Sequence, residues 1–153
     1  MAGRVEGKVA VLIGGGQTPG ETVGNGRATA LVLAREGARV FVVDRDLESA
    51  NETAKMIKEQ GGIASSCQAD VTSEEQVEMA IKSCVEQFGR LDILHNNVGA
   101  SVALKDGSAT ELETDAFDQI YAVNLRGMWL PSKHALPVMR EQNNGSIINI
   151  SSM

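Results

Sequence analysis

The sequence has few of the features that mark secreted, membrane or nucleic-acid-binding proteins. Its two cysteines, Cys67 and Cys84, are too few for a disulfide framework. No apolar run approaches the roughly 20 residues that span a bilayer, and residues 1–7 lack the apolar region of a signal peptide. The net charge of −6 is opposite to the basic surface typical of nucleic-acid-binding proteins. These absences favour a cytoplasmic protein that binds neither membranes nor nucleic acids.

The composition is that of a globular domain. The chain has 153 residues, of which 42% are hydrophobic and 22% charged, and no linker or low-complexity stretch divides it. We therefore expect residues 1–153 to form a single domain. His95 and His134 have no ligand-like neighbours in the sequence, so we expect no metal site. We expect His95 to be a strand residue satisfied in the core, His134 to lie on a helix surface, and Cys84 to pack as a small apolar residue.

Strand and helix patterns alternate along the whole chain. Short apolar runs typical of buried strands cover residues 8–13, 39–43, 63–68, 91–96 and 146–150, and amphipathic helical patterns lie between them. Repeated strand–helix units predict an α/β fold with a parallel, doubly wound sheet of the Rossmann type.

Local signals predict several helix ends. Thr72 followed by Glu75 has the pattern of a capping box, which predicts a helix start at Thr72. Residues 114–139 predict one long helix, which we expect Pro131 and Pro137 to kink or end, because proline lacks the backbone N–H that a helix interior uses.

The turn after the first strand is rich in glycine, from Gly14 to Gly26. Such a turn lets the backbone approach a pyrophosphate, whose charge is held by N–H groups at the start of the next helix. Glycine also serves plain turns. Asp44, at the end of the second strand, strengthens the first interpretation, since its distance from the loop is close to the roughly 20 residues expected for a ribose-binding carboxylate. The alternative is that Asp44 caps the helix that begins near Leu47.

Six motifs in order make the chain resemble the N-terminal part of a classical short-chain dehydrogenase/reductase over essentially all its residues. They are the glycine loop from Gly14 to Gly26, Asp44 in V-V-D-R-D, the pair Asp70-Val71, the motif Asn96-Asn97-Val98-Gly99, Asn124 in V-N-L-R-G, and Ser152 in N-I-S-S. The resemblance implies the strand order 3-2-1-4-5, with the sheet truncated after about the fifth strand.

The resemblance also implies roles in binding a nicotinamide dinucleotide. Asp44 would bind the ribose and repel the extra phosphate of NADP, which favours NAD, while Arg45 beside it would partly offset that repulsion. Asp70 and Val71 would lie beside the adenine, although Asp70 also has the pattern of a turn residue. Asn96 is expected to tie neighbouring strands together. The cofactor-binding residues implied are Gly14, Gly24, Asn25, Gly26, Asp44, Arg45, Asp70, Val71, Asn97, Val98 and Gly99.

Catalysis in the family uses four residues, of which this chain matches two. Asn124 would kink its helix and hold a water of the proton relay, the alternative being a tolerated surface asparagine. Ser152 would orient an alcohol or carbonyl substrate. The tyrosine that transfers the proton and the lysine four residues beyond it have no match, because the one tyrosine, Tyr121, is followed four positions later by Leu125. The chain alone is therefore expected to be a very poor enzyme.

Two interpretations of this shortfall stay open. The chain is the cofactor-binding half of an oxidoreductase whose tyrosine and lysine lie beyond Met153, or it is a natural short form, a catalytically inactive dinucleotide-binding or interaction protein. A full-length protein of this family would form a homo-oligomer through the helix of residues 114–139 and its neighbour. Without the remainder, the strand of residues 146–150 becomes an open apolar edge, which predicts an unstable or partner-dependent product.

The chain departs from the family pattern in three places. Ile13 stands where threonine is usual, and Val98 replaces an alanine. The glycine loop is six residues longer than the pattern. An alternative register that starts at Gly20 restores the usual spacing, but a turn should begin where the strand ends, so Gly14 is preferred as the first glycine.

Overall fold

One five-stranded parallel sheet organises the computed structural model, which describes residues 3–18, 20 and 22–151. The strand order is β3-β2-β1-β4-β5, which confirms the predicted doubly wound α/β fold. The strands are β1 (Val9–Ile13), β2 (Arg39–Asp44), β3 (Ile63–Gln68), β4 (Ile93–Asn96) and β5 (Ser146–Asn149).

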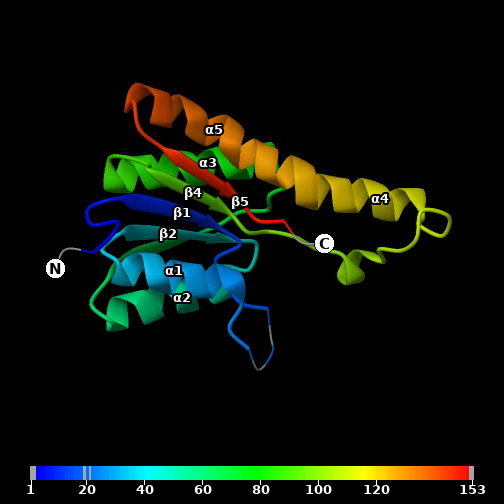
Figure 1. The fold of residues 1–153 in the computed structure, drawn as a ribbon, viewed down its shortest axis with the longest axis horizontal. Helices are drawn as coiled ribbons and strands as arrows, with labels where there is room; N and C mark the ends of the chain where they lie inside the picture. The colour runs from blue at the N-terminus through cyan, green and yellow to red at the C-terminus, as the bar shows by residue number, and fades with distance from the viewer. Residues whose placement is uncertain (1–2, 19, 21, 152–153) are drawn as a thin grey trace.

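Helices cover both faces of this sheet. Figure 1 shows α1 (Asn25–Arg35) and α2 (Leu47–Glu59) on one face, with α3 (Glu74–Phe88) and α5 (Gly127–Glu141) on the other. The two faces bury separate apolar clusters. Val11, Ile13 and Leu94 pack toward α3 and α5, whereas Leu12, Val40 and Val42 pack toward α1 and α2. The near-continuous apolar runs of β1 and β2 follow from this covering on both sides.

Helix starts follow local hydrogen bonding, with one correction to the sequence prediction. The N-cap of α3 is Ser73, whose hydroxyl accepts from the Gln76 N–H, so the predicted start at Thr72 is wrong by one residue. Thr72 instead donates its N–H and its hydroxyl to Asp70 Oδ1, at 2.8 and 2.7 Å. The Asp70 carboxylate therefore takes the hydrogen bonds of Thr72, and Thr72 does not cap the helix.

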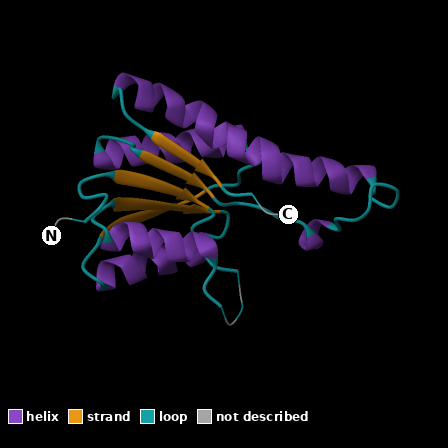
Figure 2. Cartoon of the chain, viewed as in Figure 1, coloured by secondary structure: helices purple, strands orange, loops and turns teal. Residues whose placement is uncertain are grey.

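The long predicted helix is present and is interrupted around Asn124, where the family resemblance implied a kink, and not at its prolines. It comprises α4 (Thr114–Tyr121), a π-helical turn (Ala122–Arg126) and α5, and a short 3₁₀ turn (Val102–Leu104) precedes it. Neither Pro131 nor Pro137 ends the helix, because α5 continues through both to Glu141. Figure 2 shows α4 extending beyond the sheet.

The expected packing of single residues is largely confirmed. Cys84 is fully buried in the apolar cluster of the α3 face. Asn96 ties β4 to β5, since its Nδ2 donates to Asn149 Oδ1 at 2.8 Å. His95 is buried on β4, as expected, and its Nδ1 has no hydrogen-bond partner among the described protein atoms. Within the described ranges, no helix is both long and apolar enough to cross a membrane.

Candidate functional site

The predicted cofactor-binding residues lie after the carboxyl ends of β1, β2, β3 and β4 and at the start of α1. These four strands are neighbours in a parallel sheet, so the loops that leave them meet at one edge. Figure 1 shows these loops at the ends toward which the strand arrows point. In doubly wound sheets, this edge is where ligands bind.

The glycine loop brings the end of β1 against the start of α1. Gly14 has a φ of +75°, in the left-handed region, and its N–H donates to the Val43 carbonyl at 2.8 Å. A Cβ on Gly26 would overlap the carbonyl oxygen of Gly14, so only glycine allows this approach. Gly20, the alternative first glycine, is exposed, and a Cβ there would meet only the Thr18 carbonyl oxygen, at 4.0 Å. The geometry therefore places Gly14 at the start of the turn, as preferred from the sequence.

Asp44 faces the glycine loop rather than capping a helix. Its Oδ2 accepts from the Gly16 N–H at 2.9 Å, and its Oδ1 accepts from the Asp46 N–H at 3.1 Å. The N-cap of α2 is Asp46, whose carboxylate accepts from the Ser49 N–H. The alternative interpretation of Asp44 as a helix cap is therefore wrong. Arg45 beside it is exposed.

Asp70 and Val71 form a tight turn after β3. The hydrogen bonds from the Thr72 hydroxyl and N–H, together with the nearby charge of Arg45, lower the pKa of Asp70 below its ordinary value. The Val71 side chain belongs to the core and is 6% exposed, which leaves little of its surface for a ligand. The turn role of Asp70 is thus present in the structure, and contact with adenine stays a prediction.

The segment after β4 is held from both sides. Asn97 donates its Nδ2 to the Gly14 carbonyl at 3.2 Å. A Cβ on Gly14 would lie 2.8 Å from Cγ2 of Val98, so that side chain also packs on the glycine loop. Gly99 is exposed, and a Cβ there would find only Asn124 Oδ1 nearby, at 3.8 Å.

Asn124 lies in the π-helical turn and reaches this segment. Its Oδ1 accepts from the Ala100 N–H at 2.8 Å and its Nδ2 donates to the Ala100 carbonyl at 2.9 Å. A π turn often marks a functional site. The paired bonds do not fit a tolerated surface asparagine. The role of Asn124 in a proton relay stays a prediction.

Ser152 lies outside the described residues. The chain approaches it along β5, and the Ile150 N–H donates to the Asn96 carbonyl at 3.0 Å. The last described residues therefore lie beside the carboxyl end of β4, from which the Asn97–Gly99 segment departs.

Sequence reasoning missed two polar residues that shape this edge. Gln17 makes hydrogen bonds across the glycine loop. Arg126 donates from Nη1 to the Thr72 carbonyl at 2.9 Å, and so joins the π turn to the turn of Asp70. No spacing rule marks either residue, although a glutamine inside a lengthened glycine loop is itself an unusual feature.

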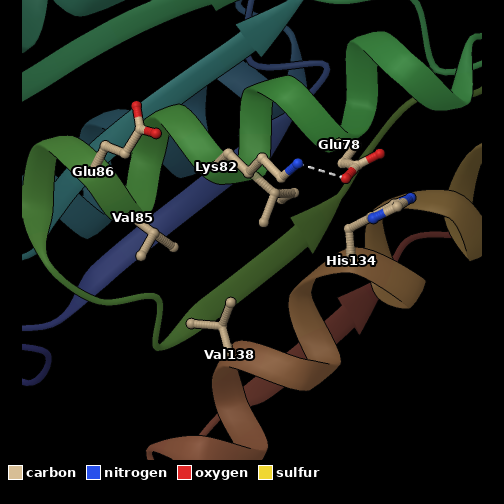
Figure 3. Close-up of a pocket in the computed structure, with 7 residues that line it drawn as sticks. Glu78, Lys82, Val85, Glu86, His134 and Val138 are labelled. Atoms are coloured by element: carbon tan, nitrogen blue, oxygen red, sulfur yellow. Dashed lines mark ion pairs between the residues drawn. The ribbon is translucent and has the colours of Figure 1, made fainter.

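A separate groove lies between α3 and α5. Figure 3 shows His134 and Val138 of α5 facing Lys82 and Val85 of α3, with an ion pair between Lys82 and Glu78 at 2.7 Å. None of the predicted site residues lines this groove. In the described part of the chain, no cluster of three metal-ligating side chains occurs.

Comparison with known proteins matches the chain to one family. The family model described as short chain dehydrogenase matches residues 8–153. The chain is 43% identical over 151 residues to the uncharacterized oxidoreductase YxbG of Bacillus subtilis, covering 99% of this chain and 52% of that protein. It is 39% identical to a 7alpha-hydroxysteroid dehydrogenase of Clostridium sardiniense, over 98% of this chain and 55% of that one.

A solved structure has the same fold. The crystal structure of a short-chain dehydrogenase/reductase from Burkholderia xenovorans superposes with a TM-score of 0.92 at 42% identity, and the match covers 99% of this chain and 58% of that one. The chain therefore spans just over half the length of these relatives.

Proposed function

We propose, from the premise that the chain belongs to the short-chain dehydrogenase/reductase family, that it is the cofactor-binding half of an NAD-dependent oxidoreductase. The reaction proposed is hydride transfer between nicotinamide and a small alcohol or carbonyl substrate. The observation that carries the proposal is the meeting of the Gly14–Gly26 contact, the Asp44 carboxylate and the Asn97–Gly99 segment at one edge of the sheet.

The residues at this edge fit a dinucleotide. The close contact of Gly26 with Gly14 leaves no side chain between the strand end and the first turn of α1, where N–H groups suit a pyrophosphate. Asp44 would accept from a ribose hydroxyl, while Asn97, Val98 and Gly99 would line the cofactor. The nicotinamide, when bound, supplies the hydride chemistry. The chain's own residues hold and orient the dinucleotide.

The carboxylate of Asp44 supports NAD over NADP. A second negative charge at about 4 Å would cost roughly 4 kcal/mol at an effective dielectric of 20, before screening by solvent. The exposed Arg45 offsets part of this cost.

Only part of the catalytic machinery is proposed to lie in these 153 residues. Asn124 would hold the proton relay through its π turn, and Ser152 would orient the substrate. Tyr121 is 51% exposed on α4 and has Leu125 four positions later, so it does not serve as the proton-transferring tyrosine. We therefore propose that the chain alone is inactive, and that a tyrosine and a lysine encoded beyond Met153 complete the site.

The surface of α4 and α5 supports a homo-oligomer of the longer protein. Phe117 and Trp129 are each more than half exposed, and apolar side chains of this size usually pack against a partner. A cytoplasmic location belongs to the proposal because both cysteines are free thiols.

The first experiment is to sequence the transcript past the codon for Met153. An open frame that encodes Tyr-x-x-x-Lys about a dozen residues on supports the oxidoreductase. The longest product should then bind NAD more tightly than NADP in a calorimetric titration, and should reduce or oxidise a panel of alcohols and ketones. A stop codon, with NAD binding and no turnover, would replace this proposal with a catalytically inactive dinucleotide-binding protein.

A further inference from the structure

Gln17 is the hydrogen-bonding centre of the lengthened glycine loop. Its Nε2 donates to the carbonyl oxygens of Thr18 and Thr22, at 2.7 and 2.8 Å. Its Oε1 accepts from the N–H of Gly24 at 2.6 Å. One carboxamide thus uses two donor hydrogens and one acceptor, and closes the loop between its two ends.

The main chain of Gln17 is fixed as well. Its N–H donates to Ser49 Oγ at 2.6 Å, and Ser49 Oγ donates in return to its carbonyl at 3.1 Å. The preceding residue, Gly16, donates to Asp44. Because Ser49 lies in the first turn of α2 and Asp44 ends β2, the base of the loop is anchored to two rigid elements.

The position held by Gln17 is the start of α1. Gly24 is the N-cap of this helix, has no side chain to cap it, and is followed by a first turn without an acidic residue. The Gly24 N–H therefore donates to the Gln17 side chain, whereas in a capping box the N-cap N–H donates to a side chain in the first turn of its own helix.

A carboxamide suits this position better than a carboxylate does. A glutamate here would still accept from Gly24, but it would lose both donors to Thr18 and Thr22. Its charge would also repel an anion at the helix start. The neutral side chain organises the loop and leaves the helix terminus favourable for negative charge.

We propose that Gln17 is a positioning residue for the dinucleotide pyrophosphate: it fixes Gly24 so that the first turn of α1 presents its N–H groups to the phosphates. This inference rests on the proposed function and adds to it a specific cause for affinity. It also explains how a loop six residues longer than the family pattern keeps a defined start of α1.

The test compares Gln17→Ala and Gln17→Glu with Gln60→Ala, a matched change at an exposed glutamine that ends α2. Calorimetric titration with NAD uses the longest protein that the gene encodes. The Gln17→Ala variant should bind NAD about tenfold more weakly than the wild type, because it loses roughly one good hydrogen bond. The affinity for adenosine, which lacks phosphates, is measured by competition and should differ by less than about twofold between Gln17→Ala and the wild type. Gln60→Ala should match the wild type for both.

Salt dependence separates positioning from general damage. The NAD affinity of Gln17→Glu should fall at least as far as that of Gln17→Ala, and part of this loss should be recovered as salt screens the added charge. Equal losses for NAD and adenosine, or unchanged NAD binding by Gln17→Ala, would overturn the inference while leaving the proposed function intact. Failure of the wild type to bind NAD would instead remove the proposed function itself.

Discussion

The region around β1 and β2 and the region around α4 and α5 differ in how completely the chain covers its own apolar surface. Every residue of β1 is buried, and β2 is buried except at its two ends. In contrast, β5 has no fully buried residue, and α4 has one. The large exposed apolar side chains of this second region are Phe117, Tyr121, Leu125, Trp129, Leu136 and Ile148.

This difference separates the region whose apolar surface is covered within the chain from the region whose apolar surface stays exposed. The contacts among the glycine loop, Asp44 and Asn97 are partly buried and lie at the ends of strands that the chain covers on both faces, so their geometry is set within this chain. Four of the exposed side chains recur every fourth residue from Phe117 to Trp129, the spacing of a single helical face. Such a face is typical of an interface. The edge that holds the glycine loop is therefore the region that the chain covers by itself (the closed region), and the surface of α4 and α5 is the region where large apolar side chains stay exposed.

The largest expected effect breaks the closed region. Gly26→Ala places a Cβ on the Gly14 carbonyl, a backbone atom that has no alternative position without moving β1 or α1. We expect a loss of about 3 kcal/mol in the free energy of unfolding and no measurable NAD binding. Urea denaturation and calorimetry measure the two quantities.

Gly107→Ala is the matched control for this change, because a Cβ at Gly107 meets no atom within 4 Å. Its free energy of unfolding should stay within about 0.5 kcal/mol of the wild type. Equal stabilities for the two variants would show that the approach of α1 to β1 is adaptable, and the contrast between the two regions would lose its basis.

Much of this closed region could be predicted from sequence because its causes are local. Continuous apolar runs gave the strands, and the glycines gave the turn at Gly14. The sequence did not decide whether Asp44 caps α2 or faces the glycine loop. The structure decides it, because Asp46 is the N-cap of α2. Gln17 was missed because its partners are main-chain atoms of a loop, and no side-chain pattern encodes their positions.

Contacts that no side-chain pattern encodes also explain the errors in two predicted helix boundaries. A pattern of Thr72 and Glu75 is compatible with a helix start, but Asp70 competes for the same hydroxyl. The prolines of α5 were expected to kink or end a helix by local rules. Pro131 lacks the N–H that would bond the carbonyl of Gly127, where the π turn already changes the hydrogen-bond pattern.

The next effect in size tests the surface of α4 and α5. Phe117→Glu puts a charge on the exposed face of α4. Self-association of the longest protein that the gene encodes should weaken by more than about tenfold, because a charge buried in an apolar interface is costly. Sedimentation velocity over a range of concentrations measures the shift. Met79→Glu, an equally exposed apolar site on α3, is the control and should leave association unchanged. Identical behaviour of the two variants would contradict an interface on α4.

A smaller effect sharpens the chemistry of the closed region. Asp44→Asn removes the negative charge but keeps a side-chain oxygen that can accept from the Gly16 N–H. The ratio of NAD to NADP affinity should fall about tenfold, because repulsion of the extra phosphate is lost while the loop anchor stays. Calorimetric titration with both dinucleotides gives the ratio. An unchanged ratio would mean that Asp44 does not face the ribose.

The smallest effect concerns β4, the strand between the two regions. Burial lowers the pKa of His95 below its ordinary value of 6.5. Between the lowered pKa and 6.5 the unfolded chain binds more protons than the folded one, so the stability that His95 contributes is complete above pH 6.5 and is lost as the pH falls. The free energy of unfolding should therefore decrease between about pH 7.5 and about pH 5.5.

The variant His95→Gln isolates this contribution, because glutamine does not titrate in that range. The decrease should be smaller in His95→Gln than in the wild type, whatever its absolute stability, and urea denaturation at the two pH values measures it. In His134→Gln, which alters the partly buried partner of Glu74 on α5, the contribution of His95 should persist. An equal decrease in the wild type and His95→Gln would mean that water reaches His95, and hence that the closed region ends at β1 rather than at β4.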